Sequence, residues 1–237
     1  MYTWRAQIGL ISPGTGPNME RDFHRFIPDG VGINTTRIPF SGTPSPEGLM
    51  DMVSHLENTC QIFRGSPQDC VMFGCTSGSL IGGPGFDRKL VDLITEASGS
   101  PGLTTSTVLV EAFKALGVSS AAVITPYPDD TNEVERQFLE HHGIHVTRIE
   151  GMNYPEDDIA LIKPQLVYEH LKKLDKTGAD CLFISCTGLN VLDLIKIAEE
   201  DFGRPVLTSN QATLWGALRH AQVGVKLPYL GELFTNH

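Results

Sequence analysis

The sequence is built from two copies of one pattern. Three blocks in the first half of the 237-residue chain recur, in the same order, in the second half. The paired blocks are 8–13 with 121–126, 69–76 with 180–187, and 99–105 with 203–209. The offset between them falls from 113 to 111 to 104 residues, as short deletions in loops would produce. We interpret the chain as a tandem duplication of one structural unit.

Each copy has the rhythm of an α/β unit, in which short apolar runs alternate with longer segments of helical periodicity. The expected strands lie near 6–12, 31–39, 69–74, 102–104, 120–125, 144–149, 180–185 and 205–208. The expected helices lie near 18–26, 46–64, 84–97, 106–116, 130–142, 159–177, 190–201 and 211–220. Strands that alternate with helices of this length form parallel sheets with helices on both faces.

The predicted fold class is therefore α/β, with two flavodoxin-like halves related by a pseudo-two-fold axis. We expect residues 1–105 to form the first half, completed by 211–237, and residues 106–210 to form the second. Each half contains a four-stranded parallel sheet. Ligands of such sheets bind outside the carboxyl ends of the strands. The active site is thus expected in the cleft between the halves.

Composition narrows the classes of partner. A formal net charge of −10 argues against nucleic acid or an anionic membrane surface, because either would repel the chain. There is no run of 18 apolar residues to span a membrane, and the first residues do not resemble a secretory signal. Five cysteines are an odd number, and their spacing does not suggest a disulfide framework. We expect a cytoplasmic protein, and its apolar helix faces suggest a homo-oligomer, either a dimer or a tetramer.

Two cysteines occupy equivalent places in the two copies. Cys75 and Cys186 each stand where a buried strand ends and a turn into a helix begins. A thiol there faces the cleft, and a nearby helix N-terminus favours its thiolate. Cys70 and Cys181 lie inside the apolar runs, so we expect them to pack as small core residues.

A pair of opposed thiols suits one kind of chemistry. Inversion of a carbon acid needs a base on one face of the carbon and an acid on the other, and a thiol with an ordinary pKa near 8.5 can serve as either. The developing negative charge needs neutral donors. The backbone N–H groups and hydroxyls of Thr76, Ser77, Thr187 and Gly188 are placed to provide them. No metal, flavin or other cofactor is required.

Four motifs resemble a known superfamily. They are Phe73–Ser79, Thr125–Glu133, Ile184–Leu189 and Ser209–Trp215. Together they are similar to the aspartate/glutamate racemase superfamily, in the branch that contains maleate cis-trans isomerase and arylmalonate decarboxylase. The resemblance covers nearly the whole chain. It implies that Cys75 and Cys186 are the catalytic pair, and that a substrate carboxylate is held by Tyr127, Thr76, Ser77 and Thr187.

The first loop departs from the maleate isomerases. Those enzymes carry an asparagine for a substrate carboxylate in a Pro-x-x-Asn pattern, and counting from Pro13 that position is Gly16. Asn18, two residues further on, is a candidate replacement. A glycine there is more like the decarboxylases, which have a single proton-delivering cysteine equivalent to Cys186 and a glycine in place of Cys75. Arg37 is either a surface residue or a contact to a second carboxylate.

These observations lead to a working hypothesis and two alternatives. The hypothesis is a cofactor-independent isomerase with two cysteines that acts on a small carboxylic acid, either as a racemase or epimerase or as a maleate-type cis-trans isomerase. The first alternative is an arylmalonate-type decarboxylase that uses Cys186 as the proton donor. The second is a binding protein for small carboxylates without chemistry.

Overall fold

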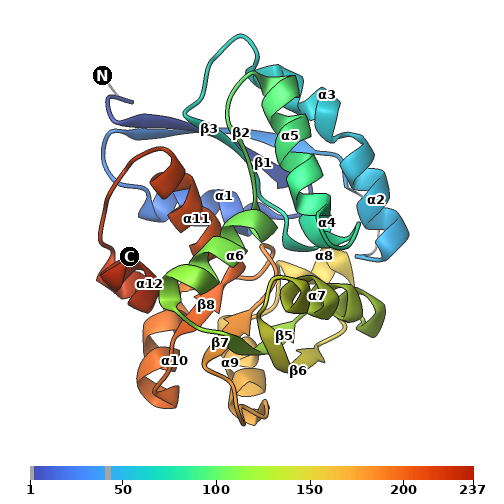
Figure 1. Cartoon of the computed structure of the whole chain (residues 1–237), viewed down its shortest axis with the longest axis vertical. Helices are drawn as coiled ribbons and strands as arrows, with labels where there is room; N and C mark the ends of the chain where they lie inside the picture. The colour runs from blue at the N-terminus through green and yellow to red at the C-terminus, as the bar shows by residue number, and fades with distance from the viewer. Residues whose placement is uncertain (1–2, 41–43) are drawn as a thin grey trace.

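Two parallel sheets organise the molecule (Figure 1). The computed structural model describes residues 3–40 and 44–237, apart from the side chain of Glu156. The first sheet has the order β2-β1-β3-β4, and the second has the same order, β6-β5-β7-β8. Their strands are β1 (Ala6–Pro13), β2 (Val31–Ile38), β3 (Cys70–Phe73), β4 (Gly102–Thr104), β5 (Ser120–Thr125), β6 (His145–Gly151), β7 (Cys181–Ile184) and β8 (Val206–Thr208). The predicted fold class is confirmed.

The helices surround the two sheets. They are α1 (Pro17–Phe26), α2 (Pro46–Ser54), α3 (Leu56–Cys60), α4 (Thr76–Leu80), α5 (Phe86–Ser98), α6 (Thr105–Leu116), α7 (Asp129–His141), α8 (Glu156–Ile159), α9 (Pro164–Lys173), α10 (Ile195–Phe202), α11 (Ser209–His220) and α12 (Gly231–Asn236). Short 3-10 turns cover Gln61–Phe63, Leu192–Leu194 and Pro228–Leu230. In the described part of the chain, no helix is long and apolar enough to cross a membrane.

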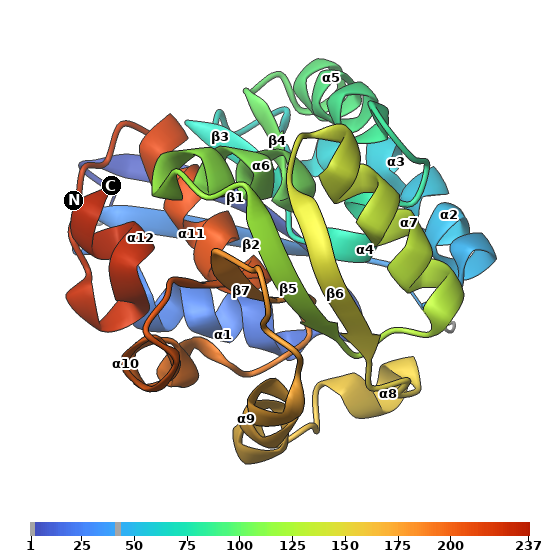
Figure 2. The same cartoon turned by 60° about the horizontal axis from the view of Figure 1, so that its bottom comes forward.

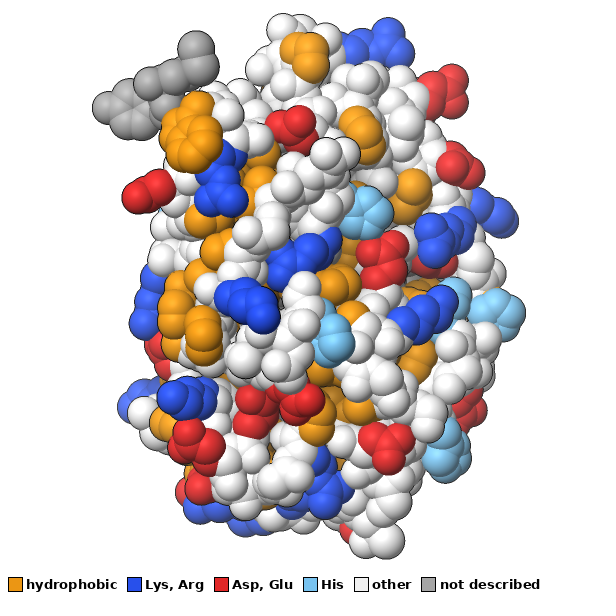
Figure 3. All heavy atoms as spheres, turned by 60° about the vertical axis from the view of Figure 1, so that its left-hand side comes forward, with side chains coloured by type: hydrophobic (Ala, Val, Ile, Leu, Met, Phe, Trp, Pro, Cys, Tyr) orange, Lys and Arg blue, Asp and Glu red, His pale blue; other side chains and the backbone are white. Residues whose placement is uncertain are grey.

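Burial explains the central strands. Every residue of β3 and β7 is buried, as is expected of parallel strands that are covered on both faces. Cys70 and Cys181 are fully buried in them, which confirms their prediction as core residues. On the face shown in Figure 3, basic, acidic and apolar side chains are interspersed.

Two expected helices are interrupted. The segment 46–64 is divided into α2, α3 and a 3-10 turn, and the segment 159–177 holds only the end of α8 and the whole of α9. Pro164 explains the second break, because the residue before a proline is driven out of the helical region. Lys163 is indeed extended, with φ −70° and ψ 138°. The short helix α4 was not predicted.

Two equivalent helices pack together between the sheets. In Figure 1, α6 and α11 lie side by side between the upper and lower sheets, and α11 contacts both β3 and β8. Each begins directly after the last strand of its sheet, where Thr104 and Thr208 accept hydrogen bonds from N–H groups of the first turn. The carboxyl ends of the two sheets therefore meet, and the hydroxyl of Thr187 after β7 donates to the carbonyl of Gly74 after β3, at 3.1 Å.

Candidate active site

A small, largely enclosed pocket lies where the ends of the strands meet. Its volume is about 20 Å³, which is room for about one water molecule. The lining residues are Pro13, Gly16, Phe40, Leu49, Cys75, Ser77, Tyr127, Cys186, Thr187 and Gly188. The pocket thus brings together seven residues that the sequence assigned to the site, including both thiols. None of these lining residues carries a charged side chain.

Cys75 lies in relaxed backbone. It follows β3 by two residues, has φ −142° and ψ 118°, and is the N-cap residue of α4. Its Sγ accepts a hydrogen bond from the backbone N–H of Gly78 at 3.3 Å, and the Ser77 hydroxyl lies 3.9 Å away. A Cβ on Gly78 would lie 3.0 Å from this sulfur and 2.5 Å from the methyl of Met52. Glycine is therefore what allows the N–H to approach the thiol.

Cys186 lies in a strained turn. Its φ of 108° is outside the regions that L-residues favour, and such a conformation costs on the order of 1–3 kcal/mol. The surrounding structure has to hold it: the backbone N–H of Cys186 donates to the Ser209 hydroxyl at 3.0 Å. The N–H of Gly188 donates to its Sγ at 3.3 Å. Strain of this kind is typical of functional sites.

The loops that carry the two thiols are tied to each other. Thr76 and Thr187 are the residues that follow the cysteines. Thr76 donates to the buried hydroxyl of Ser209 at 2.8 Å, and Ser209 in turn accepts the N–H of Cys186. Thr187 donates to Gly74, directly before Cys75. Thr76, which was predicted to hold the substrate, does not line the pocket and instead connects the loops.

Helix α1 of the first half (Figure 2) contacts the segment that follows β7 in the second half, which carries Cys186. Asn18, also predicted to bind substrate, lies outside the pocket and donates to the carbonyl of Gly188 at 2.6 Å. Arg21 donates to Asn190, and Arg25 pairs with Asp193, both at 2.7 Å. These contacts fix the segment between β7 and α10 from outside.

Arg37 is not a pocket residue either. Its guanidinium donates to the carbonyls of Pro13 and Gly16 and pairs with Glu20. It therefore braces the first loop, from which Pro13 and Gly16 line the pocket. A Cβ on Gly16 would meet only the Pro13 carbonyl, at 3.8 Å, so there is open space at this position.

Tyr127 adds a hydroxyl to the Cys186 side. Its backbone N–H donates to Thr125, whose own hydroxyl donates to Asn132, and these bonds fix the turn of the Thr-Pro-Tyr-Pro motif. The side chain is buried and hydrogen-bonds to the side chain of Cys186. Burial, followed by the charges of Cys186, Glu135 and Cys75, raises the pKa of Tyr127 well above its usual value. The phenol stays protonated and can donate a hydrogen bond.

Three features were missed from the sequence. Phe40 and Leu49 form an apolar wall, and nothing in an isolated Phe or Leu signals that role. The link from Ser209 to Cys186 was also missed, although Ser209 belongs to a motif that had been recognised. Its place directly after β8, equivalent to Thr105 after β4, was the available signal.

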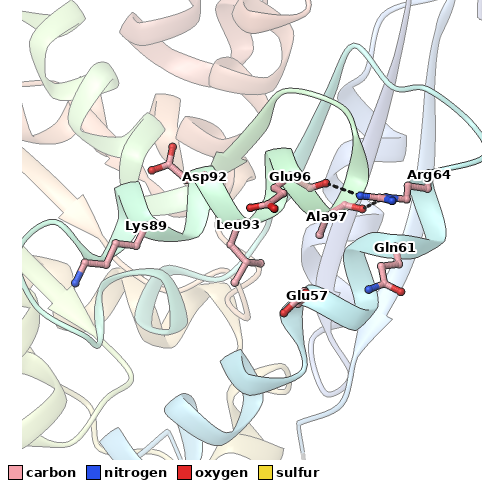
Figure 4. A pocket seen from close by; sticks show the side chains of 8 residues that line it. All are labelled: Glu57, Gln61, Arg64, Lys89, Asp92, Leu93, Glu96 and Ala97. Carbon is pink, nitrogen blue, oxygen red and sulfur yellow. Dashed lines mark hydrogen bonds between the residues drawn. The ribbon is translucent and has the colours of Figure 1, made fainter.

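A larger hollow elsewhere does not have these properties. It lies between α3 and α5, has a volume of about 600 Å³, and is lined mainly by charged side chains (Figure 4). Its Arg64 is engaged with the carbonyls of Ala97 and Glu96 at the end of α5. Since no thiol lines this hollow, we assign the site to the smaller pocket at the strand ends.

Comparison with known proteins identifies the family of the chain. Residues 8–234 match the arylmalonate decarboxylase family. The chain belongs to this family. Arylmalonate decarboxylase from Bordetella bronchiseptica is 30% identical over 96% of this chain and 95% of its own length. Maleate isomerase from Nocardia farcinica is 27% identical over 96% of this chain and 94% of its own. The relatives of this chain therefore include enzymes with two different activities, a decarboxylase and an isomerase.

One solved structure matches the fold of this chain over almost its whole length. It is a cysteine-to-serine mutant of the Nocardia farcinica maleate cis-trans isomerase with a covalently bound succinylcysteine intermediate. The TM-score is 0.91 and the identity is 24%, with 98% of this chain and 99% of that chain covered.

Proposed function

We propose that this protein is a cofactor-independent isomerase that acts on a small carboxylic acid through Cys75 and Cys186, in a reaction of the maleate cis-trans type. One observation carries the proposal: equivalent strand ends of the two halves place both thiols on one small pocket. A binding protein for carboxylates has no need of two thiols there. A decarboxylase of the related type uses only the thiol on the Cys186 side.

The surroundings assign different roles to the two thiols. Each sulfur accepts one backbone N–H at 3.3 Å, but only Cys75 stands at the start of a helix, whose N-terminus stabilises a thiolate, so we assign Cys75 as the nucleophile. Cys186 lies in a turn and is assigned as the proton donor, and the phenol of Tyr127 can stabilise its sulfur once the proton has been given up. Ser77, Thr187 and Tyr127 offer neutral hydroxyls to the substrate carboxylates.

The reaction balances without an oxidant or reductant. The Cys75 thiolate adds to one alkene carbon, and the π electrons of the double bond capture the proton of Cys186 at the other carbon. The resulting C–C single bond rotates. Cys186 then takes a proton back from that carbon, the C–S bond breaks, and the double bond re-forms in the trans arrangement. The covalent succinylcysteine of the Nocardia enzyme is an intermediate of this kind and supports the proposal.

The size of the pocket limits the substrate. A volume of about 20 Å³ is smaller than any dicarboxylic acid, so binding must displace lining side chains. We expect the side chains of Leu49 and Phe40, which form the apolar wall, to move when the substrate binds. Small, flat acids displace the least, which favours a four-carbon substrate over a bulky one.

A second candidate function rests on Gly16 and the apolar wall. Space at Gly16, without an amide for a second carboxylate, suits an acid with an apolar substituent of which the site holds one carboxylate. In that case the two thiols exchange a proton at the α-carbon and racemise it, or Cys186 protonates the carbanion left by decarboxylation of a substituted malonate.

One panel experiment separates these functions. The protein is incubated in D₂O with maleate, with single enantiomers of 2-arylpropionates and with phenylmalonate, and NMR follows the products. We expect maleate to become fumarate. Deuterium at the α-carbon with loss of optical activity would identify a racemase, and release of CO₂ a decarboxylase. No reaction with any of them, together with thiols of ordinary alkylation rate, would contradict the proposal and leave a binding protein.

The variant Gly16→Asn sharpens the choice between one carboxylate and two. The open space at this position accommodates an amide, and one hydrogen bond to a charged group contributes about 1.5–3 kcal/mol. For a dicarboxylate substrate we expect kcat/KM on maleate to rise about tenfold or more. The matched control is Gly16→Ala, which fills the same space without a donor. A fall in both variants would indicate that the space is needed by the substrate itself.

A further inference from the structure

The two halves carry a buried carboxyl at the same position of their first helix. The buried residues of α1 include 18, 19, 22 and 26, and those of α7 include 131, 132, 135 and 139. The offset is 113 throughout, as it is for β1 and β5. Asp22 and Glu135 are therefore equivalent residues, and both are almost inaccessible to solvent.

Only one of these two carboxyls accepts hydrogen bonds from the part of the chain that the structure describes. Asp22 accepts hydrogen bonds from Asn210 at 2.7 Å and from Arg21 at 3.2 Å. Neither oxygen of Glu135 has a hydrogen-bond partner among the described residues. Buried carboxyls are normally paired, so an unpaired one needs another explanation.

Glu135 lies near the residue that precedes Cys186. The Ser185 hydroxyl, on the residue before Cys186, is close enough to lower the pKa of the carboxyl. A charge on Glu135 in turn raises the pKa of Tyr127. The other titratable groups that act on this phenol are the two thiols, Cys186 from the loop after β7 and Cys75 from the start of α4, against which α7 packs.

The burial of Glu135 has an electrostatic consequence. It raises the pKa of the carboxyl to about 7, an effect that outweighs the lowering by the Ser185 hydroxyl. Below that pH the residue is neutral. Above it, a negative charge stands in a low-dielectric region behind the place where an anionic substrate has to bind.

We propose that Glu135 is a positioning residue that sets the charge behind Tyr127 and Cys186, and thereby sets how tightly the site holds a carboxylate. The neutral form leaves Tyr127 free to donate to the substrate. The ionised form repels the substrate through its charge. This inference builds on the proposed function, but it concerns the charge of the pocket and is testable without turnover.

Thiol alkylation by two reagents of nearly equal size measures that charge. Iodoacetate is anionic and iodoacetamide is neutral, so the ratio of their rates cancels changes in the ionisation of the thiol itself. In the unmodified protein we expect the iodoacetate/iodoacetamide ratio to fall about fivefold between pH 6 and pH 8, because a buried negative charge near the site disfavours the anionic reagent. In Glu135→Gln, which is neutral at every pH, the ratio should stay constant.

Two control variants, and one variant in which the midpoint of the pH dependence should move, complete the design. Glu133→Gln changes an exposed carboxyl on the same helix, and Asp22→Asn changes the equivalent carboxyl of the other half. Both should keep the fall in the ratio. Ser185→Ala removes the hydroxyl that favours ionisation, so the midpoint should move to higher pH; this test remains if Glu135→Gln does not fold.

The outcomes separate this inference from the proposed function. An unchanged fall in Glu135→Gln, or an unmoved midpoint in Ser185→Ala, would overturn the role of Glu135 whatever the substrate. If the ratio behaves as expected but maleate is not converted, the role of Glu135 stands and the proposed reaction does not. With maleate as substrate, KM should rise with pH through the same range in the unmodified protein and stay level in Glu135→Gln, with kcat less affected.

Discussion

Cys75 and Cys186 are equivalent residues in two copies of one unit, yet their settings differ. Cys75 has ordinary extended backbone and caps a short helix of its own half. Cys186 has a φ of 108°, is followed by a turn, and is held in place through Ser209 and through α1 of the other half. The sulfur and backbone of Cys75 are supported within its own helix, although its neighbours Gly74 and Thr76 are tied to the other half. The backbone of Cys186, in contrast, is itself held by a long-range contact. Equivalent positions have therefore become unequal in backbone conformation and in support.

The largest effect is expected when either thiol is removed. Cys75→Ala and Cys186→Ala should each lower turnover of the identified substrate by 10³-fold or more, about 4 kcal/mol in the barrier, because each thiol has a step that nothing else performs. Initial rates measure this, and circular dichroism checks the fold. Cys60→Ala, which changes a buried thiol in α3, is the control and should retain activity. Full activity in either single mutant would exclude a reaction that uses two thiols.

The next largest effect concerns the two buried carboxyls, Glu135 and Asp22, and the dependence of stability on pH. Glu135 titrates near pH 7 in the folded protein and near 4.5 when unfolded, so the folded state holds a proton between these values that the unfolded state has lost. Stability therefore falls by about 3 kcal/mol as pH rises from 4.5 to 7, and does not recover above 7. Glu135→Gln should remove this part of the fall, while the parts contributed by Asp22 and Glu199, whose pKa values burial also raises, should remain. Urea denaturation at pH 4.5 and pH 8 measures it.

Asp22→Asn is the comparison from the other half. It weakens the hydrogen bonds donated by Asn210 and Arg21, so we expect a loss of stability at both pH values. A pH dependence in Glu135→Gln equal to that of the unmodified protein would mean that another group is responsible.

The support of the Cys186 turn can be tested at Ser209. Ser209→Ala removes the acceptor for the N–H of Cys186 and for the hydroxyl of Thr76. We expect a loss of about 2 kcal/mol in stability, because two buried donors lose their partner, and a fall in kcat of about tenfold. Thr105→Val, at the equivalent position, should lose about 1 kcal/mol of stability and leave kcat almost unchanged. Equal losses of kcat in the two variants would remove the distinction between the halves.

The smallest expected effect measures the backbone strain at Cys186. At a φ of 108°, glycine adopts the backbone conformation with less strain than alanine does. The variant Cys186→Gly should therefore be about 1 kcal/mol more stable than Cys186→Ala. At Cys75 two effects oppose each other: extended backbone favours alanine, whereas the N-cap position of α4 favours glycine, so Cys75→Gly and Cys75→Ala should be similar in stability. Denaturation midpoints of the four variants measure both differences. A preference for glycine at Cys186 no larger than that at Cys75 would contradict the strain at Cys186.

The sequence predicted most of the fold because its signals are local. Buried strands such as β3 and β7 appear as unbroken apolar runs, and the repeat supplied the pairing of the halves. The helix α4 was missed because Thr76-Ser77-Gly78 resembles a turn, and it becomes a helix where Cys75 caps it. The prediction of one helix over 159–177 ignored the constraint that Pro164 imposes on Lys163.

The site was predicted less completely than the fold. Both thiols, Ser77, Tyr127, Thr187, Gly188 and Gly16 line the pocket, but Thr76 and Asn18 point into the contacts between loops. Spacing along the chain tells which loop a residue belongs to, and the direction of its side chain is decided by residues far away in sequence. The catalytic and binding roles of these residues stay predictions until the variants are measured.

The contacts of the two equivalent threonines also bear on how such a molecule arises. In a dimer of one unit, a two-fold axis makes every contact twice, so a substitution that suits one side is imposed on the other. Here the symmetry is broken: Thr187 donates to Gly74, whereas Thr76 donates to Ser209 and not to Ser185, the equivalent of Gly74. Covalent fusion of the copies releases each side from the symmetry. A nucleophile and a proton donor can then evolve from what began as a single residue.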